Sequence, residues 1–259
     1  MLELTGIEKV FSAGTENEQV LFRDFSLTVK KGDFVSVIGS NGSGKTTLFN
    51  LISGSDTPDK GQIFLEGKDI THLSEYRRGE RIGRVYQNPA LGTVPGLSVL
   101  ENLLLADNKG KVFGLTPLRN KEKQERLAAL AESLGLGLEE KLNVPVGLLS
   151  GGQRQALSLL TSAMRPLDLL LLDEHTAALD PKTADRVMDL TLRIVKEKKV
   201  TTVMVTHNLK YAAAYGDRLL MMHGGKVILD VEGEEKNKCD VDSLLNRFYQ
   251  ISVEAGNAV

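Results

Sequence analysis

The segment Gly39–Thr46 contains the residue types that a protein needs to bind a phosphate group. Its sequence, GSNGSGKT, fits the pattern G-x-x-x-x-G-K-[S/T], although an ordinary glycine-rich turn is the alternative. Small residues allow successive backbone N–H groups to curl around an anion. Lys45 can reach the β- and γ-phosphates of a nucleotide, and the hydroxyl of Thr46 can bind Mg²⁺. The residues predicted to bind nucleotide here are Gly39, Ser40, Asn41, Gly42, Ser43, Gly44, Lys45, Thr46 and Thr47.

Two carboxylates, Asp173 and Glu174, directly follow the apolar run Leu169–Leu172. A strand that is buried on both faces of a parallel sheet has this composition, and ligands bind beyond the carboxyl ends of such strands. We expect Asp173 to hold Mg²⁺ directly or through water, and Glu174 to orient or deprotonate an attacking water. Taken alone, each residue is more often a helix-capping or solvent-facing carboxylate, and the phosphate loop roughly 130 residues upstream favours the role at a nucleotide.

Three further candidate residues lie at the ends of predicted strands. His207 ends a second buried strand, Val200–Thr206, and can contact the γ-phosphate or the water; a structural histidine is the alternative. Gln87 follows the short strand Ile82–Tyr86, where most glutamines are simple surface groups. Phe11 precedes a polar loop and can stack on a base, or can be an ordinary core residue at a strand end.

The segment Leu149–Gln153, with the sequence LSGGQ, is a second candidate anion site. A serine and two glycines open a helix, which is a favourable place for negative charge. A single chain has no use for an unpaired γ-phosphate site on its helical part. Two chains that face each other head to tail would bring this segment against the nucleotide held by the other subunit.

The elements around these motifs follow from hydrophobic periodicity and from helix start and stop signals. A buried strand, Asp33–Ile38, precedes the phosphate loop, and a helix, Thr47–Ile52, follows it and stops near Gly54. Alternating residues in the first 30 positions predict an antiparallel sheet. The charged stretch Glu75–Arg81 is interpreted as a solvated helix face.

From Ser98 to Met164 the pattern becomes helical. Predicted helices are Ser98–Ala106, Lys121–Leu134, one that begins at Ser150 as N-cap and ends before Pro166, and Pro181–Lys198. Further predicted elements are the strands Leu219–Met222 and Lys226–Asp230 and a short helix, Val241–Tyr249. The predicted fold class is α/β: a parallel-sheet core of the P-loop NTPase type, an antiparallel β subdomain and an inserted α-helical subdomain.

Composition limits the partners. The formal net charge of -2 over 259 residues gives no general attraction to nucleic acid or to an acidic membrane. Cys239 is the one cysteine, so no internal disulfide forms and a reducing cytosol is expected. No apolar run approaches the roughly 18 residues of a membrane span, and the N-terminus lacks signal-peptide features. We therefore expect a partner to hold the protein at any membrane where it works.

The motifs occur in the order found in the ATP-binding subunit of an ABC transporter, and the chain resembles that family over about residues 1–230. The resemblance implies ATP hydrolysis with ATP and Mg²⁺ as cofactors, and ligands for Mg²⁺ at Thr46, Gln87 and Asp173. It implies that Phe11 stacks on adenine and that Asp180, in the segment Ala178–Asp180, lines a subunit interface. Catalytic roles fall on Glu174, His207, Gln87 and Lys45. The cofactor-binding residues supplied across the dimer are Ser150, Gly151, Gly152 and Gln153.

The resemblance also implies an architecture and partners. Residues 1–230 form the ATP-binding domain, with a helical subdomain inserted at about 95–164, and residues 231–259 form a C-terminal tail. The expected partners are a second copy or a paired ATPase, an integral membrane permease and an extracytoplasmic substrate-binding protein, with no nucleic acid. The expected location is the cytoplasmic face of the membrane. Import is the expected direction, and the off-membrane alternative is an ATPase of this family in translation, DNA repair or iron–sulfur assembly.

Departures from the family pattern point to a subgroup. His175 stands where the family usually has proline, and Ala156–Leu160 is more apolar than the usual arginine-bearing helix. Three segments, Ser12–Glu18, Asp173–Ala184 and Met221–Lys226, resemble a bacterial importer group that works with a lipoprotein-type binding protein. Tryptophan or tyrosine is the cargo implied by that resemblance. A regulatory subunit without catalysis is disfavoured, because Glu174 and His207 are both present.

Overall fold

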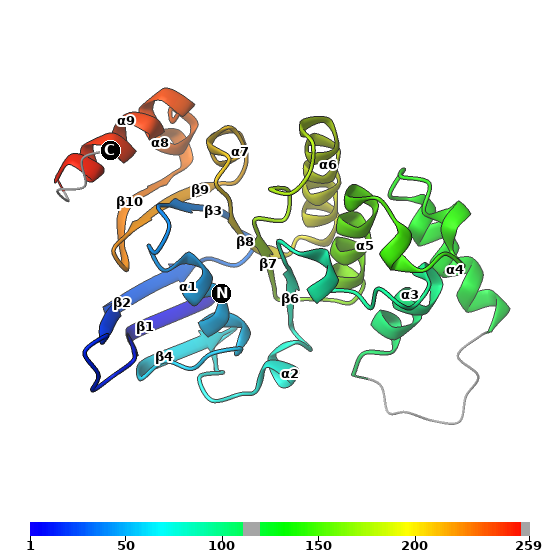
Figure 1. Cartoon of the computed structure of the whole chain (residues 1–259), viewed down its shortest axis with the longest axis horizontal. Helices are drawn as coiled ribbons and strands as arrows, with labels where there is room; N and C mark the ends of the chain where they lie inside the picture. The colour runs from blue at the N-terminus through cyan, green and yellow to red at the C-terminus, as the bar shows by residue number, and fades with distance from the viewer. Residues whose placement is uncertain (111–119, 255–259) are drawn as a thin grey trace. The chain divides into compact units, whose positions relative to one another are not determined.

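The computed structural model of the chain describes residues 1–110 and 120–254. They fold as two units, the first made of Met1–Arg78 and Thr201–Val259 and the second of Gly79–Val200 (Figure 1). Residues 111–119 of the predicted helical subdomain and 255–259 of the predicted tail lie outside the described residues. The domain boundaries given above remain predictions.

The predicted antiparallel sheet is present in the first unit. Its strand order is β2-β1-β4-β5. Leu4 lies opposite Leu27 of β2 and Ile63 of β4, and all three side chains are buried, so this face of the sheet belongs to the core. The strands are β1 (Leu2–Phe11), β2 (Gln19–Val29), β4 (Lys60–Leu65) and β5 (Lys68–Asp69).

The strands that precede the phosphate loop, the carboxylates and His207 pair in parallel. In the first unit, β3 (Phe34–Gly39) pairs in parallel with β8 (Thr201–Val205) and β9 (Arg218–His223), and β10 (Lys226–Glu232) pairs antiparallel with β9. In the second unit, β6 (Ile82–Val85) pairs in parallel with β7 (Leu169–Asp173). Every residue of β3, β7 and β8 is buried, as expected for strands covered on both faces.

Helices of the second unit begin after side-chain caps, of which Ser150 was predicted from the sequence. Ser98 caps α3 and Ser150 caps α5, in each case with a reciprocal capping box, and Asp180 caps α6 ahead of a proline at the first helical position. The helices are α3 (Val99–Asn108), α4 (Lys121–Glu132), α5 (Gly151–Ala163) and α6 (Pro181–Lys198), with 3₁₀ turns at η1 (Pro89–Leu91), η2 (Glu139–Lys141) and η3 (Val146–Leu148).

The first unit also contains helices, and its C-terminal helix packs on the sheet that carries the phosphate loop. Leu244 of α9 is buried in one cluster with Ile38 of β3 and Leu219 of β9. Cys239 is partly buried against the same cluster, as a free thiol. The helices of this unit are α1 (Lys45–Ser53), α2 (Glu75–Arg78), α7 (Leu209–Ala214), α8 (Gly233–Asn237) and α9 (Val241–Glu254).

The interpretation of Glu75–Arg81 as a solvated helix face is wrong at Arg78. Its side chain is 2% exposed, and the guanidinium donates to the backbone oxygens of Leu51 at 2.6 Å, Ile52 at 3.0 Å and Thr71 at 2.8 Å. The carbonyls at the C-terminal end of a helix have no partner within the helix, so a buried arginine satisfies those of α1. Burial lowers the pKa of Arg78 from its ordinary value.

Candidate functional site

The loop Gly39–Gly44 connects β3 to α1, as the sequence predicted. A Cβ at Gly39 would lie 2.3 Å from the backbone oxygen of Met222 on β9, so only glycine fits there. Gly44 has a φ of +102°, in the left-handed region that favours glycine. Gly44 is also the N-cap of α1 and makes no side-chain capping bond, so no side chain covers the helix N-terminus, which is a favourable place for an anion.

Lys45 begins α1 and folds over this loop. Its side chain is buried, and Nζ donates to the backbone oxygens of Gly39 at 2.8 Å and Ser40 at 2.9 Å. A third contact, 3.4 Å, reaches Oγ of Ser43. An ammonium group and an uncapped helix N-terminus therefore meet at one loop of small residues, which is the charge and shape that a triphosphate requires.

The two carboxylates lie at the carboxyl end of β7, in the second unit. Asp173 is the last residue of the strand and is buried, and its Oδ2 accepts a hydrogen bond from Nη2 of Arg84 at 2.7 Å. Glu174 has a φ of +46°. Residues with a side chain rarely adopt this left-handed conformation, and the strain concentrates at functional sites. The fold thus turns the chain sharply at the residue predicted to act as base.

Gln87 is exposed just beyond β6, and the residue before it is tied to α5. Gln155, which is buried in α5, donates from Nε2 to the backbone oxygen of Tyr86 at 3.1 Å. The segment Leu149–Gln153 opens the same helix. One hydrogen bond within the second unit therefore joins α5, which begins at the predicted second anion site, to the residue that precedes the predicted Mg²⁺ ligand Gln87.

The LSGGQ segment has the geometry of a capped helix start. Oγ of Ser150 accepts from the backbone N–H of Gln153, and Oε1 of Gln153 accepts from the backbone N–H of Ser150, each at 3.3 Å. Lys141 adds a positive charge by donating to Oε1 of Gln153 at 3.1 Å. Ser150 is exposed, whereas Gly152 is buried and a Cβ there would lie 2.2 Å from the methyl of Thr183.

The remaining predicted residues lie at the ends of elements. His207 is exposed just after β8. Phe11, the last residue of β1, is 39% exposed with Nζ of Lys9 5.4 Å from its ring centroid, so the alternative of a core phenylalanine is wrong. Asp180 accepts from the backbone N–H of Thr183 at 3.1 Å, and its hydrogen bonds to Thr183 lower its pKa.

Comparison with known proteins identifies the family. Residues 22–177 match the family model described as ABC transporter. The chain belongs to the ABC transporter family.

Individual relatives agree with this assignment. The chain is 48% identical over 248 residues, or 96% of its length and 98% of the relative's, to a tyrosine transport ATP-binding protein of Clostridioides difficile strain R20291. It is 31% identical to the phosphonates import ATP-binding protein PhnC of Lactococcus lactis subsp. cremoris strain SK11, covering 95% of this chain and 99% of that one. Among solved structures, the dimeric ATP-binding cassette MJ0796 bound to ADP and Pi superposes with a TM-score of 0.77 at 28% identity, covering 90% of this chain and 98% of that one.

These findings confirm several predictions made from the sequence. The fold is α/β of the P-loop NTPase type, and the protein is an ABC transporter ATPase that binds ATP with Mg²⁺. Within residues 1–110 and 120–254, no helix is both long enough and apolar enough to cross a membrane.

The residues present fit the nucleotide and its metal. Mg²⁺ takes oxygen ligands and is usually held by one or two protein groups together with substrate phosphates, not by an all-protein cage. Thr46 and Asp173 each offer an oxygen of the required kind. The roles of individual residues at the site remain predictions.

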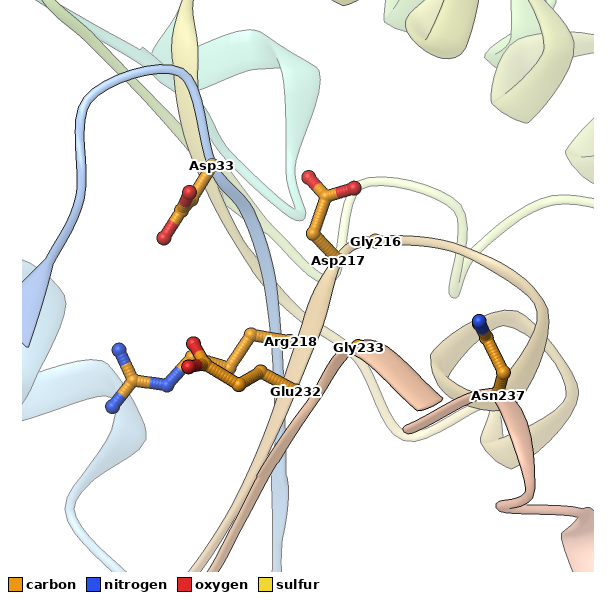
Figure 2. A pocket seen from close by; sticks show the side chains of 7 residues that line it. All are labelled: Asp33, Gly216, Asp217, Arg218, Glu232, Gly233 and Asn237. Atoms are coloured by element: carbon orange, nitrogen blue, oxygen red, sulfur yellow. The ribbon is translucent and has the colours of Figure 1, made fainter. Parts of the chain in front are cut away.

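A separate pocket lies at the opposite end of β3 from the phosphate loop. It has a volume of about 310 Å³ and is lined by residues around Asp33, which precedes the strand, and Asp217, which precedes β9 (Figure 2). Oδ2 of Asp217 accepts from the backbone N–H of Phe34 at 2.9 Å. Because the loop follows the carboxyl end of β3, this pocket is not the nucleotide site.

His175, one of the two departures from the family pattern, is a buried residue of the second unit. Its side chain is 2% exposed and Nε2 lies 3.1 Å from Oγ1 of Thr191, whose hydroxyl donates to the backbone oxygen of Val187 at 2.7 Å. Thr191 therefore accepts from His175, and Nε2 carries the proton of a neutral ring. Burial lowers the pKa of His175 to about 4.

This burial predicts a loss of stability in acid. The unfolded chain binds a proton at His175 near pH 6.5 and the folded chain only near pH 4, so the free energy of unfolding falls as the pH falls between those values. His175 should account for about 3 kcal/mol of that loss. The free energy of unfolding is measured in urea for the wild type and for His175→Gln at pH 7, 6, 5 and 4. The contribution of His175 is the difference between the two plots of this free energy against pH. Parallel profiles would contradict the prediction.

Proposed function

We propose that this ATPase powers the import of an amino acid of the tyrosine type through a membrane permease. The observation that carries the proposal is the 48% identity, over almost the whole chain, to a protein named for tyrosine transport. Relatives named as methionine and phosphonates import proteins support uptake as the direction. In this proposal the chain works at the cytoplasmic face of the membrane, held by the permease, and a substrate-binding protein delivers the cargo.

The ATP site is assigned by the chemistry that each residue offers. Lys45 and the backbone N–H groups of the phosphate loop bind the β- and γ-phosphates. Glu174 orients or deprotonates the attacking water, and His207 contacts the γ-phosphate or that water. Phe11, an exposed ring at the end of a strand, stacks on adenine. When bound, Mg²⁺ neutralises charge on the phosphate oxygens, and its proposed protein ligands are Thr46, Gln87 and Asp173.

A second copy of the chain completes each site. Ser150 is exposed at the N-terminus of α5, which is a favourable place for an anion. In a head-to-tail dimer, Ser150 and Gly152 of one protomer bind the γ-phosphate held by the other. ATP then closes the dimer because these contacts form only in the closed state, which provides the differential affinity that a population shift needs. Asp180, exposed at the start of α6, is the proposed interface residue.

An exposed apolar segment beside Gln87 is the proposed permease contact. Leu91, the last residue of η1, is 68% exposed, and Val94 is 45% exposed. Exposed apolar side chains close together in one segment are typical of protein–protein contacts. Gln87 lies four residues before Leu91. A permease bound at this segment would therefore act directly on the strand end that carries a proposed Mg²⁺ ligand.

Copurification tests the membrane assignment. A tagged chain expressed in its own host should bring a polytopic membrane protein through detergent extraction, and the double substitution Leu91→Glu with Val94→Glu should release that protein. Tyr76→Glu, at a side chain that is 72% exposed in the first unit, is the matched control and should retain it. ATP binding should persist in all three proteins, because neither change touches the phosphate loop.

The outcomes separate the two candidate functions. Recovery of soluble partners only would favour the off-membrane role over transport. Uptake of labelled tyrosine, tryptophan and methionine by cells lacking the gene, with and without the restored chain, tests the cargo. Restored uptake of methionine alone would contradict an importer of the tyrosine type.

A further inference from the structure

Arginine–aspartate ion pairs join β6 to β7 at both ends of the two strands. Arg81 contacts Asp168 just before the strands begin, and Arg84 contacts Asp173 where β7 ends, at 2.7 Å. The two pairs differ in burial. The side chains of Arg81 and Asp168 are 42% and 22% exposed, whereas those of Arg84 and Asp173 are 9% and 12% exposed. The pair at the carboxyl end is therefore the one shielded from water.

Strand register explains why Arg84 reaches Asp173. Arg84 lies opposite Leu171, two residues before Asp173, so the three side chains share one face of the parallel pair. The ring of Tyr86, on the same face, lies against the guanidinium with 4.7 Å between its centroid and Cζ of Arg84. Oγ of Ser162 on α5 donates to the backbone oxygen of Arg84 at 3.0 Å. Both the head group and the backbone of Arg84 are thus held in place.

We propose that Arg84 is a positioning residue for the carboxylate that binds Mg²⁺. The inference rests on the proposed role of Asp173 as a metal ligand. Arg84 holds Oδ2, which fixes the orientation of the carboxylate and leaves its other oxygen for the metal or for a metal-bound water. Hydrogen-bond partners of metal ligands commonly contribute about 10–100-fold to metal affinity.

A buried carboxylate also needs a compensating charge throughout a catalytic cycle in which metal and nucleotide come and go. Removing one partner of a buried ion pair leaves the other charge uncompensated, which is strongly destabilising. Arg84 supplies that charge from a neighbouring strand.

Metal binding measured apart from turnover tests this role. Mn²⁺, used in place of Mg²⁺, is titrated into the ATP complexes of the wild type, Arg84→Met, Arg84→Lys and Arg81→Met, and bound Mn²⁺ is followed by electron paramagnetic resonance. Arg84→Met should lower the Mn²⁺ affinity by about 10–100-fold. Arg84→Lys, which keeps the charge, should restore part of it. Arg81→Met, which breaks the matched pair at the other end, should bind Mn²⁺ like the wild type.

Two further measurements isolate the mechanism. ATP affinity in EDTA should be the same for Arg84→Met and wild type, because the arginine acts through the metal ligand. The double variant of Arg84→Met with Asp173→Asn should bind Mn²⁺ no more weakly than Asp173→Asn alone. Should Arg84→Met fail to fold, Arg84→Lys carries the test, since a lysine lacks the planar fork that fixes a carboxylate.

Three results would overturn the inference. The first is wild-type Mn²⁺ affinity in Arg84→Met, or in Arg84→Lys where only that variant folds. The second is a loss of ATP affinity in EDTA as large as the loss of Mn²⁺ affinity, which would make Arg84 a nucleotide contact, and the third is additive losses of Mn²⁺ affinity in the double variant. Wild-type Mn²⁺ affinity in Asp173→Asn would instead overturn the proposed role of Asp173 as a metal ligand, and so the two failures are distinguishable.

Discussion

The Glu174→Gln variant is expected to bind ATP as the wild type does but to hydrolyse it at least ~100-fold more slowly, and to accumulate as an ATP-bound dimer. The amide keeps the size of the side chain and its position at the carboxyl end of β7, but it cannot accept a proton. Because the contacts proposed to close the dimer come from the phosphate loop and from Ser150, closure should survive while the chemical step stalls. The closed state then persists.

The left-handed backbone at Glu174 supports this reading of the residue. A φ of +46° costs conformational energy on the order of 1–3 kcal/mol, which the surrounding structure must supply. Such strain persists where the direction of a side chain matters. A glutamine adopts the same backbone no more easily than a glutamate, so the variant changes the chemistry with little further effect on the fold.

The measurement combines phosphate release with light scattering in the presence of ATP and Mg²⁺. The control is Glu132→Gln, at an exposed glutamate at the end of α4, and this variant should hydrolyse ATP at the wild-type rate. If Glu174→Gln hydrolyses ATP at a near wild-type rate, Glu174 is not the base. His207, exposed just after β8, would then be the next candidate.

Local sequence signals predicted the elements that carry the motifs. The helix predicted at Pro181–Lys198 is α6 with the same bounds, because aspartate before proline marks its start and lysines fill its last turn. The strand before the phosphate loop and the helix after it were predictable for a similar reason, since two apolar runs differ sharply in composition from the glycine-rich turn between them. The beginning of β2 at Gln19 was not predicted, because its first two residues are exposed and resemble the loop before them.

What the sequence could not predict depends on distant partners or on backbone geometry. Arg78 and Arg84 both occur in stretches that look solvated or simply strand-like, and only tertiary pairing places them against α1 and Asp173. An arginine within an otherwise apolar strand was the available signal for Arg84. The positive φ of Glu174 has no sequence signal, because glutamate does not favour that conformation. The functional residue that sequence reasoning missed is therefore one that acts through another residue.

Lys45→Ala is expected to abolish ATP binding in calorimetry. The lysine brings the only formal positive charge of the loop Gly39–Thr46. Hydrogen bonds to charged groups contribute about 1.5–3 kcal/mol each, and the ammonium has three donors, so an affinity loss of at least ~100-fold follows from two such bonds to phosphate. Glu174→Gln and Lys45→Ala thus fail at different steps, one after binding and the other at binding.

The interpretation of Lys45→Ala requires a check on the loop itself. In the structure Nζ donates to the backbone oxygens of Gly39 and Ser40, so at least one of these bonds must give way when two of its three donors bind phosphate. Lys45→Ala leaves both carbonyls without that partner. Lys45→Met keeps the apolar stem of the side chain and reduces this disturbance. Lys226→Ala, at an exposed lysine on β10, controls for the loss of one positive charge and should bind ATP normally. Urea unfolding of each variant distinguishes a collapsed loop from a lost phosphate contact. Unchanged ATP affinity in both Lys45 variants would show that the lysine does not bind phosphate.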